Sequence, residues 1–149
     1  MSALPAVAIA TVFGCGFSPI WPGTIGALLA LPLVYFLGFL DPAIMGVIYL
    51  ALFLLCGWAA HRAGRIFREP DHRAIVCDET WAMAVVWECT PADLRWMLVS
   101  FIVFRLFDAA KPWPISAIDR NLKNGFGVML DDACAALATI LSVFVLHVY

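Results

Sequence analysis

Apolar residues occur along the chain in long runs that are separated by short polar breaks. The runs cover residues 24–40, 42–60, 74–88, 94–107 and 131–149. A helix that crosses the roughly 30 Å hydrocarbon core of a bilayer needs about 20 apolar residues. The pattern therefore predicts an all-α, integral membrane helical bundle with about four to five membrane-embedded helices. The runs at 74–88 and 94–107 are short, so we expect these helices to tilt little, sit shallowly or thin the bilayer.

The N-terminal part of the chain follows a different pattern. Its first apolar stretch, residues 2–13, is too short to cross a bilayer and predicts a short helix in the interface or against the bundle. The segment GCGFSPIWPGTIG at residues 14–26 is rich in glycine and proline, which break helices. It is either a plain turn or a loop whose amides, with Ser18 and Thr24, face an anion at the start of the next helix.

Prolines and acidic residues predict where the later helices bend, begin and end. Pro32 predicts a kink in the first span. Asp93 is placed to cap the helix that follows it. Pro112 ends that helix, and a polar segment follows. Asp131 and Asp132 then predict the beginning of the last span.

The composition is that of a membrane protein. Of the 149 residues, 64% are hydrophobic and 13% are charged, against roughly 25% charged residues in a soluble domain. We therefore expect one membrane domain over residues 1–149. A net charge of −2 argues against a nucleic-acid partner, which requires a basic surface. The first residues lack the basic start of a signal peptide, so we expect no cleavage.

The five cysteines do not form a metal or redox motif. None pairs as C-x-x-C, and most lie in or beside apolar runs, where cysteine behaves as a small hydrophobe. Cys56 and Arg62 have the C-x5-R spacing of cysteine phosphatases, but helix-forming alanines lie between them. We therefore expect no disulfide, no zinc site and no cysteine nucleophile.

Basic residues follow the second apolar run and predict its orientation. They are His61, Arg62, Arg65, Arg68 and Arg73. Because basic residues mark cytoplasmic loops, we expect this end of the bundle to face the cytoplasm. Setting this orientation and contacting lipid headgroups are sufficient to explain the presence of any one of these arginines. If the helices alternate in direction, the charged motifs at residues 78–79, 105–108 and 131–132 lie on the same face, with the start of the first span.

The segment 104–132 combines carboxylates and cations between two apolar flanks. Its charged residues are Arg105, Asp108, Lys111, Asp119, Arg120, Lys123, Asp131 and Asp132. Charges at membrane depth cost roughly 2.5–3.5 kcal/mol each on insertion scales, so such a cluster predicts a functional site. Carboxylates suit a divalent cation, and cations suit a phosphate group.

A magnesium-dependent phosphate site is the specific hypothesis. Mg²⁺ binds carboxylates, waters and substrate phosphate oxygens, and the candidate ligands are Asp78, Glu79, Asp108, Asp131 and Asp132. Arg105 and Lys111 would hold the phosphoryl oxygens. The metal would activate a water or orient a carboxylate nucleophile, and both routes stay open. The simpler alternatives are an ion pair between Arg105 and Asp108 and acidic capping of a helix N-terminus by Asp131 and Asp132.

Three blocks of the chain resemble the phosphatidylglycerophosphatase A family of Mg²⁺-dependent lipid phosphatases in the bacterial inner membrane. They are GCGFSPIWPGTIGALLALP, AIVCDE at residues 74–79, and FRLFDAAKPWPISAIDRNLKNGFGVMLDD. The resemblance implies removal of the terminal phosphate of phosphatidylglycerophosphate at the cytoplasmic face, with this lipid and the surrounding membrane lipids as partners. It implies catalytic roles for Asp78, Glu79, Asp108 and Asp132. It implies substrate binding by Arg105, Lys111, Asp119 and Arg120. Thr24 is added to this group because it lies in the loop that is expected to face an anion.

The chain departs from the family pattern at three positions. Ala82 and Asn124 stand where glycine is common, and Glu88 is an unusual charge near the far end of its helix. The first two would loosen or shift helix packing at small-residue contacts, but no charged site residue is lost, so we expect an active enzyme. The alternatives are a phosphatase for phosphatidic acid or a polyprenyl phosphate, and a transporter or other non-enzymatic protein that binds ions.

Overall fold

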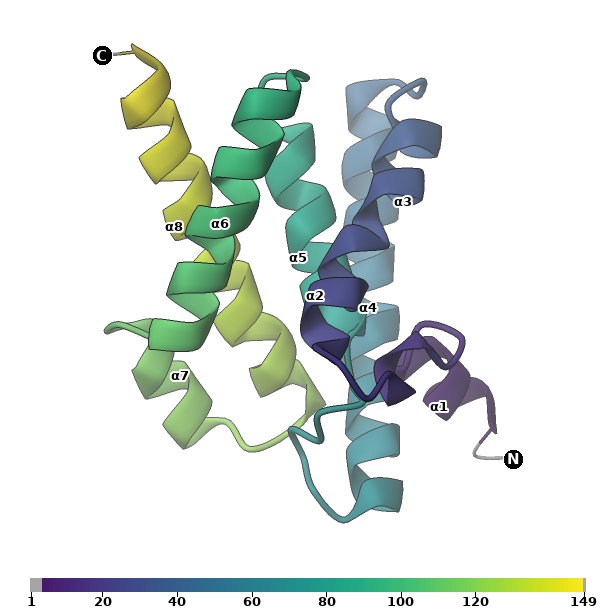
Figure 1. Ribbon diagram of the computed structural model, residues 1–149. Coiled ribbons are helices and arrows are strands. Elements are labelled where there is room, and N and C mark those ends of the chain that lie inside the picture. The colour runs from purple at the N-terminus through teal and green to yellow at the C-terminus, as the bar shows by residue number, and fades with distance from the viewer. Residues whose placement is uncertain (1–3, 149) are drawn as a thin grey trace.

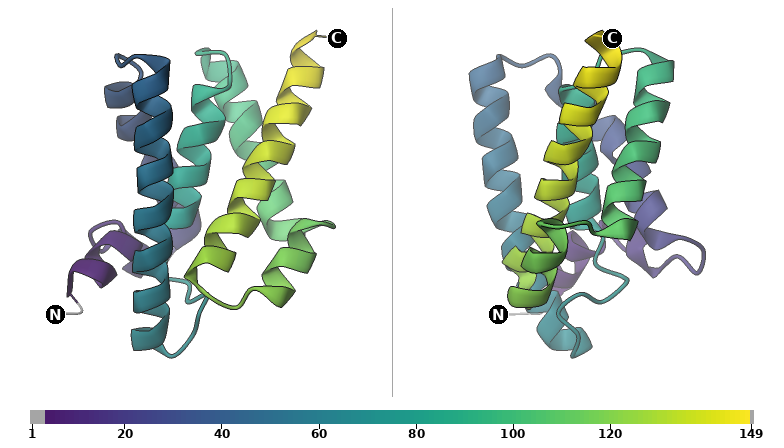
Figure 2. Two further views of the ribbon diagram at one scale, coloured as in Figure 1. Left: turned by 180° about the vertical axis from the view of Figure 1, so that it is seen from behind. Right: turned by 90° about the vertical axis from the view of Figure 1, so that its left-hand side faces the viewer.

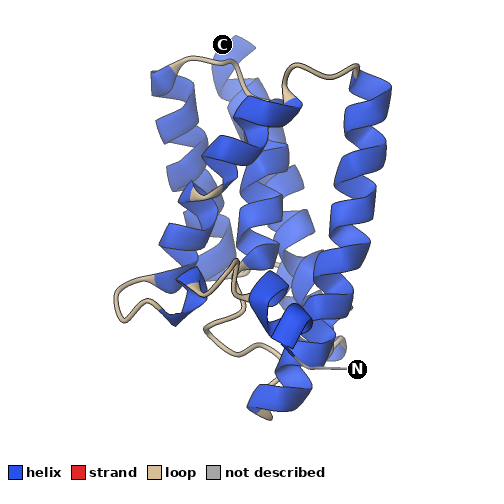
Figure 3. Ribbon diagram, turned by 90° about the vertical axis from the view of Figure 1, so that its right-hand side faces the viewer, coloured by secondary structure: helices blue, strands red, loops and turns tan. Residues whose placement is uncertain are grey.

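The computed structural model describes residues 4–148, which form helices and no strand (Figures 1 and 3). The elements are α1 (Leu4–Ala10), the 3₁₀ helix η1 (Cys15–Phe17), α2 (Pro22–Leu28), α3 (Ala30–Leu37), α4 (Pro42–Phe67), α5 (Cys77–Glu88), α6 (Leu94–Ala110), α7 (Ile115–Asn121) and α8 (Gly125–Val148). The predicted all-α class is confirmed. A short N-terminal helix is present, while residues 2, 3 and 149 of the predicted ranges lie outside the described residues.

The longer helices run side by side, and the two ends of the bundle differ (Figures 1 and 2). The short helices α1 and α7 and the loop between α4 and α5 lie at one end, which we call the α7 end. The turns at residues 38–41 and 89–93 and the last residue described in α8 lie at the opposite end. Segments that are distant in sequence therefore meet at the α7 end.

Helices α4 and α8 are long and apolar enough to cross a membrane. Helices α2 and α3 together form a shorter apolar stretch at residues 22–37. Large apolar side chains remain exposed along α4 and α8, among them Val47, Leu50, Leu141 and Phe144. An exposed apolar surface of this extent is unusual for a soluble monomer and suits contact with lipid. These observations support a membrane protein with two candidate spans.

Helix α5 lies at the centre of the bundle and packs against α2, α3, α4 and α8. Met83 on α5 and Phe104 on α6 are fully buried in the main core, and so is Ala82. The Thr80 hydroxyl donates a 2.7 Å hydrogen bond to the Gly26 carbonyl and joins α5 to α2. The methyl group of Ala82, where glycine was expected, is therefore accommodated in this core.

Glycine allows a close contact between α4 and the beginning of α8. A Cβ atom at Gly125 would lie 2.1 Å from the backbone nitrogen of His61 and 2.4 Å from the carbonyl oxygen of Gly57. A side chain at this position would therefore push the two helices apart. The contact fixes where α8 starts relative to α4, and so where the acidic residues of α8 lie.

The predicted span at residues 24–40 is interrupted, and the bend predicted at Pro32 occurs slightly earlier in the chain. The chain forms α2 and α3 with a break at Leu29, three residues before the predicted kink at Pro32. Pro32 has no amide hydrogen to donate to the Leu28 carbonyl, and its ring clashes with that carbonyl. The disruption therefore acts on the turn that precedes the proline.

The predicted beginning of the last helix is also wrong. Helix α8 begins at Gly125, so Asp131 and Asp132 lie inside it and do not cap it. The side chain of Asn124 accepts a 2.9 Å hydrogen bond from the Gly127 amide and caps the helix instead. By contrast, the predicted cap at Asp93 is confirmed, because its carboxylate accepts a 2.8 Å hydrogen bond from the Arg95 amide.

Candidate active site

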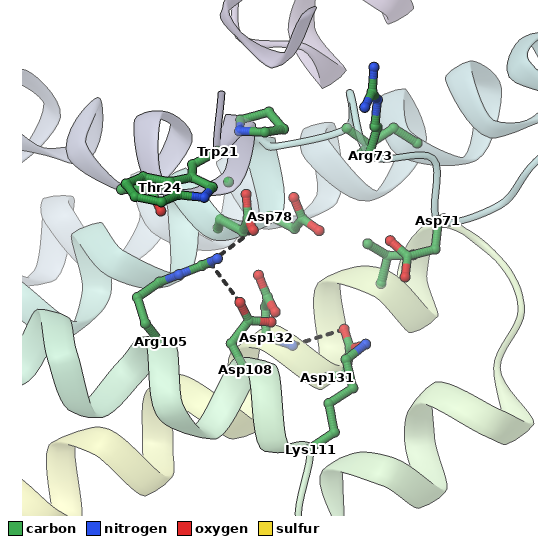
Figure 4. A pocket seen from close by; sticks show the side chains of 15 residues that line it. Trp21, Thr24, Asp71, Arg73, Asp78, Arg105, Asp108, Lys111, Asp131 and Asp132 are labelled. Atoms are coloured by element: carbon green, nitrogen blue, oxygen red, sulfur yellow. Dashed lines mark hydrogen bonds and ion pairs between the residues drawn. The ribbon is translucent and has the colours of Figure 1, made fainter. Parts of the chain in front are cut away.

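A polar cavity of about 390 Å³ lies toward the α7 end of the bundle (Figure 4). Side chains from α2, the α4–α5 loop, α5, α6, α8 and the α6–α7 connection line it. The lining residues are Trp21, Pro22, Gly23, Thr24, Asp71, Arg73, Ile75, Asp78, Glu79, Arg105, Asp108, Lys111, Val128, Asp131 and Asp132. Carboxylates from four segments of the chain therefore converge on one space, and three cations lie among them.

Helix α5 contributes two adjacent acids from its first turn. Asp78 is buried, with 5% of its surface exposed, and Glu79 is half-buried. Helix α2 begins close to them, because Gly23 has no side chain: a Cβ atom there would lie 2.0 Å from Glu79 Oε1. Thr24, on the same helix, also lines the cavity. The GTIG segment therefore forms one wall of the site.

Arg105 forms two ion pairs, one that joins α6 to α5 and one within α6. Its Nη1 atom donates to Glu79 Oε1 at 3.0 Å and to Asp108 Oδ2 at 2.6 Å. The predicted pairing with Asp108 is present, and the bond to Glu79 adds a contact that spacing along α6 alone does not indicate. The guanidinium therefore binds one carboxylate from each helix, and Figure 4 shows Arg105 beside Asp108 at the cavity.

Lys111 follows the last residue of α6 and binds two further acids. Its Nζ atom donates to Asp119 Oδ1 at 2.8 Å and to Asp131 Oδ2 at 2.7 Å. Burial lowers the pKa of the Lys111 amine, but these two hydrogen bonds outweigh it and raise the pKa above its ordinary value. The hydrogen bond from Lys111 lowers the pKa of the Asp119 carboxyl. Both groups are therefore charged at neutral pH.

Three carboxylate oxygens in the cavity have no hydrogen-bond partner among the described residues. They are Asp78 Oδ1, Glu79 Oε2 and Asp132 Oδ2, and all three are buried. A buried, unpaired carboxylate oxygen is costly unless a cation or donor meets it. Such oxygens, drawn from α5 and α8, are the donor type that a hard divalent cation selects.

The cavity does not hold a ready-made cage of metal ligands. Within residues 4–148, no group of three or more His, Cys, Asp or Glu residues is arranged to hold a metal ion. Mg²⁺ does not require such a cage, because it usually keeps several waters and takes one or two carboxylates plus substrate phosphate. The unpartnered oxygens therefore fit Mg²⁺ better than they fit a metal that needs four or more protein ligands.

The structure brings most of the predicted site residues together. Thr24, Asp78, Glu79, Arg105, Asp108, Lys111, Asp131 and Asp132 all line the cavity. Asp119 lies beside it and reaches it through Lys111. Arg120 does not line it: its guanidinium bonds to the Ser116 carbonyl and hydroxyl on the exposed side of α7. Ser18 is also outside, since its hydroxyl bonds to Ile20.

Three charged or aromatic residues that line the cavity are not among the predicted site residues. Trp21 stands immediately before α2, while Asp71 and Arg73 lie in the loop before α5. Arg73 belongs to the basic run that predicts the orientation of the bundle. Because that prediction explains the charge of Arg73, the sequence gives no separate reason to place it in the site. The neighbouring AIVCDE block was the available signal, because a loop that leads directly into two buried acids also borders their site.

Residues 4–148 form an all-helical bundle with two helices long and apolar enough to cross a membrane, and acids and cations share one polar cavity, an arrangement suited to phosphate chemistry beside a membrane. The sequence profile of the family described as Phosphatidylglycerophosphatase A matches residues 8–147. The chain belongs to this family, which is one of lipid phosphatases.

Three curated relatives cover most of the chain. Phosphatidylglycerophosphatase A of Escherichia coli is 35% identical over 87% of this chain and 76% of its own length. The protein of the same name from Haemophilus influenzae is 34% identical over 96% of this chain and 89% of its own. A Bacteroides thetaiotaomicron protein, provisionally named a phosphatidylinositol-3-phosphatase, is 36% identical over 93% and 91%. No solved structure matches the chain.

Proposed function

We propose that the protein hydrolyses the terminal phosphomonoester of phosphatidylglycerophosphate to phosphatidylglycerol and inorganic phosphate. The observation that carries the proposal is the convergence of acids from α5, α6 and α8 with Arg105 and Lys111 in one cavity of an apolar bundle. Two of the relatives are named for this reaction. A transporter would place charged groups along a path through the bundle, whereas these lie toward one end.

Magnesium is the cofactor in this proposal. The unpartnered oxygens of Asp78, Glu79 and Asp132 support it, and Asp108 and Asp131 are further candidate ligands in the same cavity. When bound, the ion neutralises charge on the transferred phosphoryl group and lowers the pKa of a bound water.

The chain's own residues position the phosphate and move the proton. Arg105 presents a planar fork and Lys111 a point charge to the phosphoryl oxygens. A water attacks phosphorus, the bond from phosphorus to the glycerol oxygen breaks, and a carboxylate takes the proton that the water loses. That proton, or one from solvent, then neutralises the departing alkoxide. Direct attack by a carboxylate, with later hydrolysis of the aspartyl phosphate, is the second route.

The chain forms one membrane domain in this proposal, with the α7 end in the cytoplasm. Helices α4 and α8 cross the bilayer, and α2–α3, α5 and α6 bring the embedded segments to about five. Helix α5 has 12 residues and is about 18 Å long, so it does not cross alone. Basic residues support the orientation: of the nine Lys and Arg residues, all within the described range, only Arg95 lies at the opposite end. The membrane is the bacterial inner membrane.

Phosphate release by the detergent-purified protein tests the proposal. We expect release from phosphatidylglycerophosphate that requires Mg²⁺ and stops with EDTA, and slower release from phosphatidic acid. Phosphatidylinositol 3-phosphate is included because a relative is named for that lipid. Faster release from either alternative lipid would replace the substrate and keep the phosphatase. If folded protein releases phosphate from none of the three, the cavity binds an anion without hydrolysing it.

A further inference from the structure

A second, smaller cavity lies where the last turns of α4 meet the beginning of α8. Its volume is about 240 Å³. The lining residues are His61, Gly64, Arg65, Arg68, Pro70, Lys123, Asn124 and Gly125. None of them lines the polar cavity of the candidate active site. We call this space the basic cavity. Figure 2 shows the beginning of α8 beside the lower part of α4, at the α7 end.

Close backbone contacts build the basic cavity. The approach of Gly125 to the backbone of His61 holds the α7–α8 loop, and Lys123 with it, against α4. On the other side, a Cβ atom at Gly64 would lie 3.0 Å from Pro70, so the chain folds back closely after the helix ends. Arg68 makes this reversal in the left-handed region, with φ of 60°. The backbone segments that carry these cations are thus packed together, although they lie more than fifty residues apart in the sequence.

The lining of the basic cavity contains cations and no carboxylate. Arg65 and Arg68 form none of the ion pairs found within residues 4–148. Lys123 has one, a 3.8 Å contact with Asp119, and its side chain is 62% exposed. An exposed pair of this length contributes little. Three like charges in one cavity repel one another, and a bound anion relieves that repulsion.

We propose that the basic cavity binds the phosphate group of an anionic phospholipid, at a site separate from the catalytic one. Guanidinium groups bind phosphate as planar forks and an ammonium binds it as a point charge. The cavity is bounded by α4 and α8, the two helices long enough to cross a membrane, so it lies where headgroups reach. Basic pockets between membrane helices are a known type of lipid headgroup site. The proposal holds whichever lipid the catalytic cavity hydrolyses.

Thermal unfolding of the full chain in a non-ionic detergent tests this site. The probes are dioleoyl phosphatidylglycerol, dioleoyl phosphatidylcholine and inorganic phosphate, each titrated separately. We expect phosphatidylglycerol to raise Tm in a saturable way and phosphatidylcholine to leave it unchanged, because a ligand that binds only the folded state stabilises it. A rise of equal size with phosphatidylcholine, or none with phosphatidylglycerol, would overturn the proposal.

Matched single substitutions locate the effect. Arg65→Gln and Lys123→Gln should each weaken the phosphatidylglycerol response by about tenfold in concentration, the loss expected for one charged hydrogen bond. Arg62→Gln makes the same charge change on the same helix outside the cavity and should keep the response. Equal loss in all three variants would mean general attraction to anionic micelles and overturn the site.

Two further readouts separate the possible outcomes. The lipid-free Tm of each variant should match that of the original chain, since these side chains are exposed; phosphate release should also persist, because none of them lines the catalytic cavity. Should inorganic phosphate produce the same Arg65-dependent rise at similar concentration, the cavity binds free phosphate and the lipid proposal fails.

Discussion

Lys111 connects three elements through a single amine. It follows the end of α6 and bonds to Asp119 on α7 and to Asp131 on α8. Asp131 is only 4% exposed, so its charge depends on this partner. A phosphate that enters the cavity would compete with these carboxylates for the same ammonium protons. Lys111 therefore has a structural function in the free protein and is placed to contact the substrate.

Replacing Lys111 with Ala should weaken substrate capture. Loss of one charged hydrogen bond predicts a rise in KM of roughly 10-fold or more, measured by phosphate release over a range of lipid concentrations. Lys123→Ala removes a neighbouring ammonium outside the catalytic cavity and is the control. If only kcat fell, Lys111 would act on the transition state instead. Tm of the variant should also fall, because Asp131 loses its partner.

Asp108→Asn tests the carboxylate that Arg105 orients on α6. The amide keeps the shape of the side chain but can neither take a proton nor attack phosphorus, so we expect kcat to fall by at least about 100-fold. Circular dichroism should show an unchanged helical signal. Asp41→Asn is the matched control, because Asp41 caps α4 at the opposite end and asparagine also caps helices well. Near-normal turnover would remove Asp108 from the catalytic set.

At the scale of elements, helix α2 depends on a glycine to reach the acids of α5. Gly23→Ala would place a methyl group 2.0 Å from Glu79 Oε1, so α2 or the carboxylate must move. We expect a large loss of phosphate release at little cost in expression. Gly46→Ala is the control, because a Cβ atom there meets nothing within 4 Å and alanine favours the helix. Full activity of Gly23→Ala would show that α2 can move away from Glu79 without any effect on the reaction.

The helices and most of the site could be predicted from the chain, for identifiable physical reasons. Apolar runs indicate buried or lipid-facing helices whatever the tertiary contacts, and a local cap such as Asp93 needs only its own neighbours. The acids of α5, α6 and α8 stood out because charges are rare in apolar runs. Such signals depend only on neighbouring residues in the sequence. They identify helices and candidate site residues, but they do not indicate how one helix packs against another.

The errors arose where tertiary contacts decide the outcome. The acidic pair predicts that the last helix begins at Asp131, yet α8 begins at Gly125, because the absence of a side chain at Gly125 allows its close contact with α4. Arg120 lies in the charged segment but on the outer side of α7, and no sequence spacing indicates which side faces the cavity. Arg73 was the reverse case, a cavity residue inside a run that charge alone explained.

At the scale of the whole molecule, the distribution of charge predicts an orientation that one natural cysteine can test. Cys89 is exposed and follows α5 at the end opposite the catalytic cavity. In spheroplasts, which lack an outer-membrane barrier but keep the inner membrane intact, a membrane-impermeant maleimide should label Cys89. The Cys89→Ala substitution should abolish that labelling. Cys15 lies at the α7 end and should react only after the cells are opened. Labelling of Cys89 only in opened cells would reverse the topology.

The shortness of α5 also affects which molecules can reach the acids. Helix α4 extends beyond the first turn of α5 at the α7 end (Figure 1), and Asp78 lines the cavity with only 5% of its surface exposed. In the proposed reaction, the acyl chains of a phospholipid would hold it beside this cavity, and its phosphate would therefore be present at high effective concentration. A dissolved sugar phosphate or nucleotide has no such anchor and must lose its hydration on entering from dilute solution. On the proposed function, the depth of the site would therefore disfavour soluble phosphate esters without any group that recognises and rejects them.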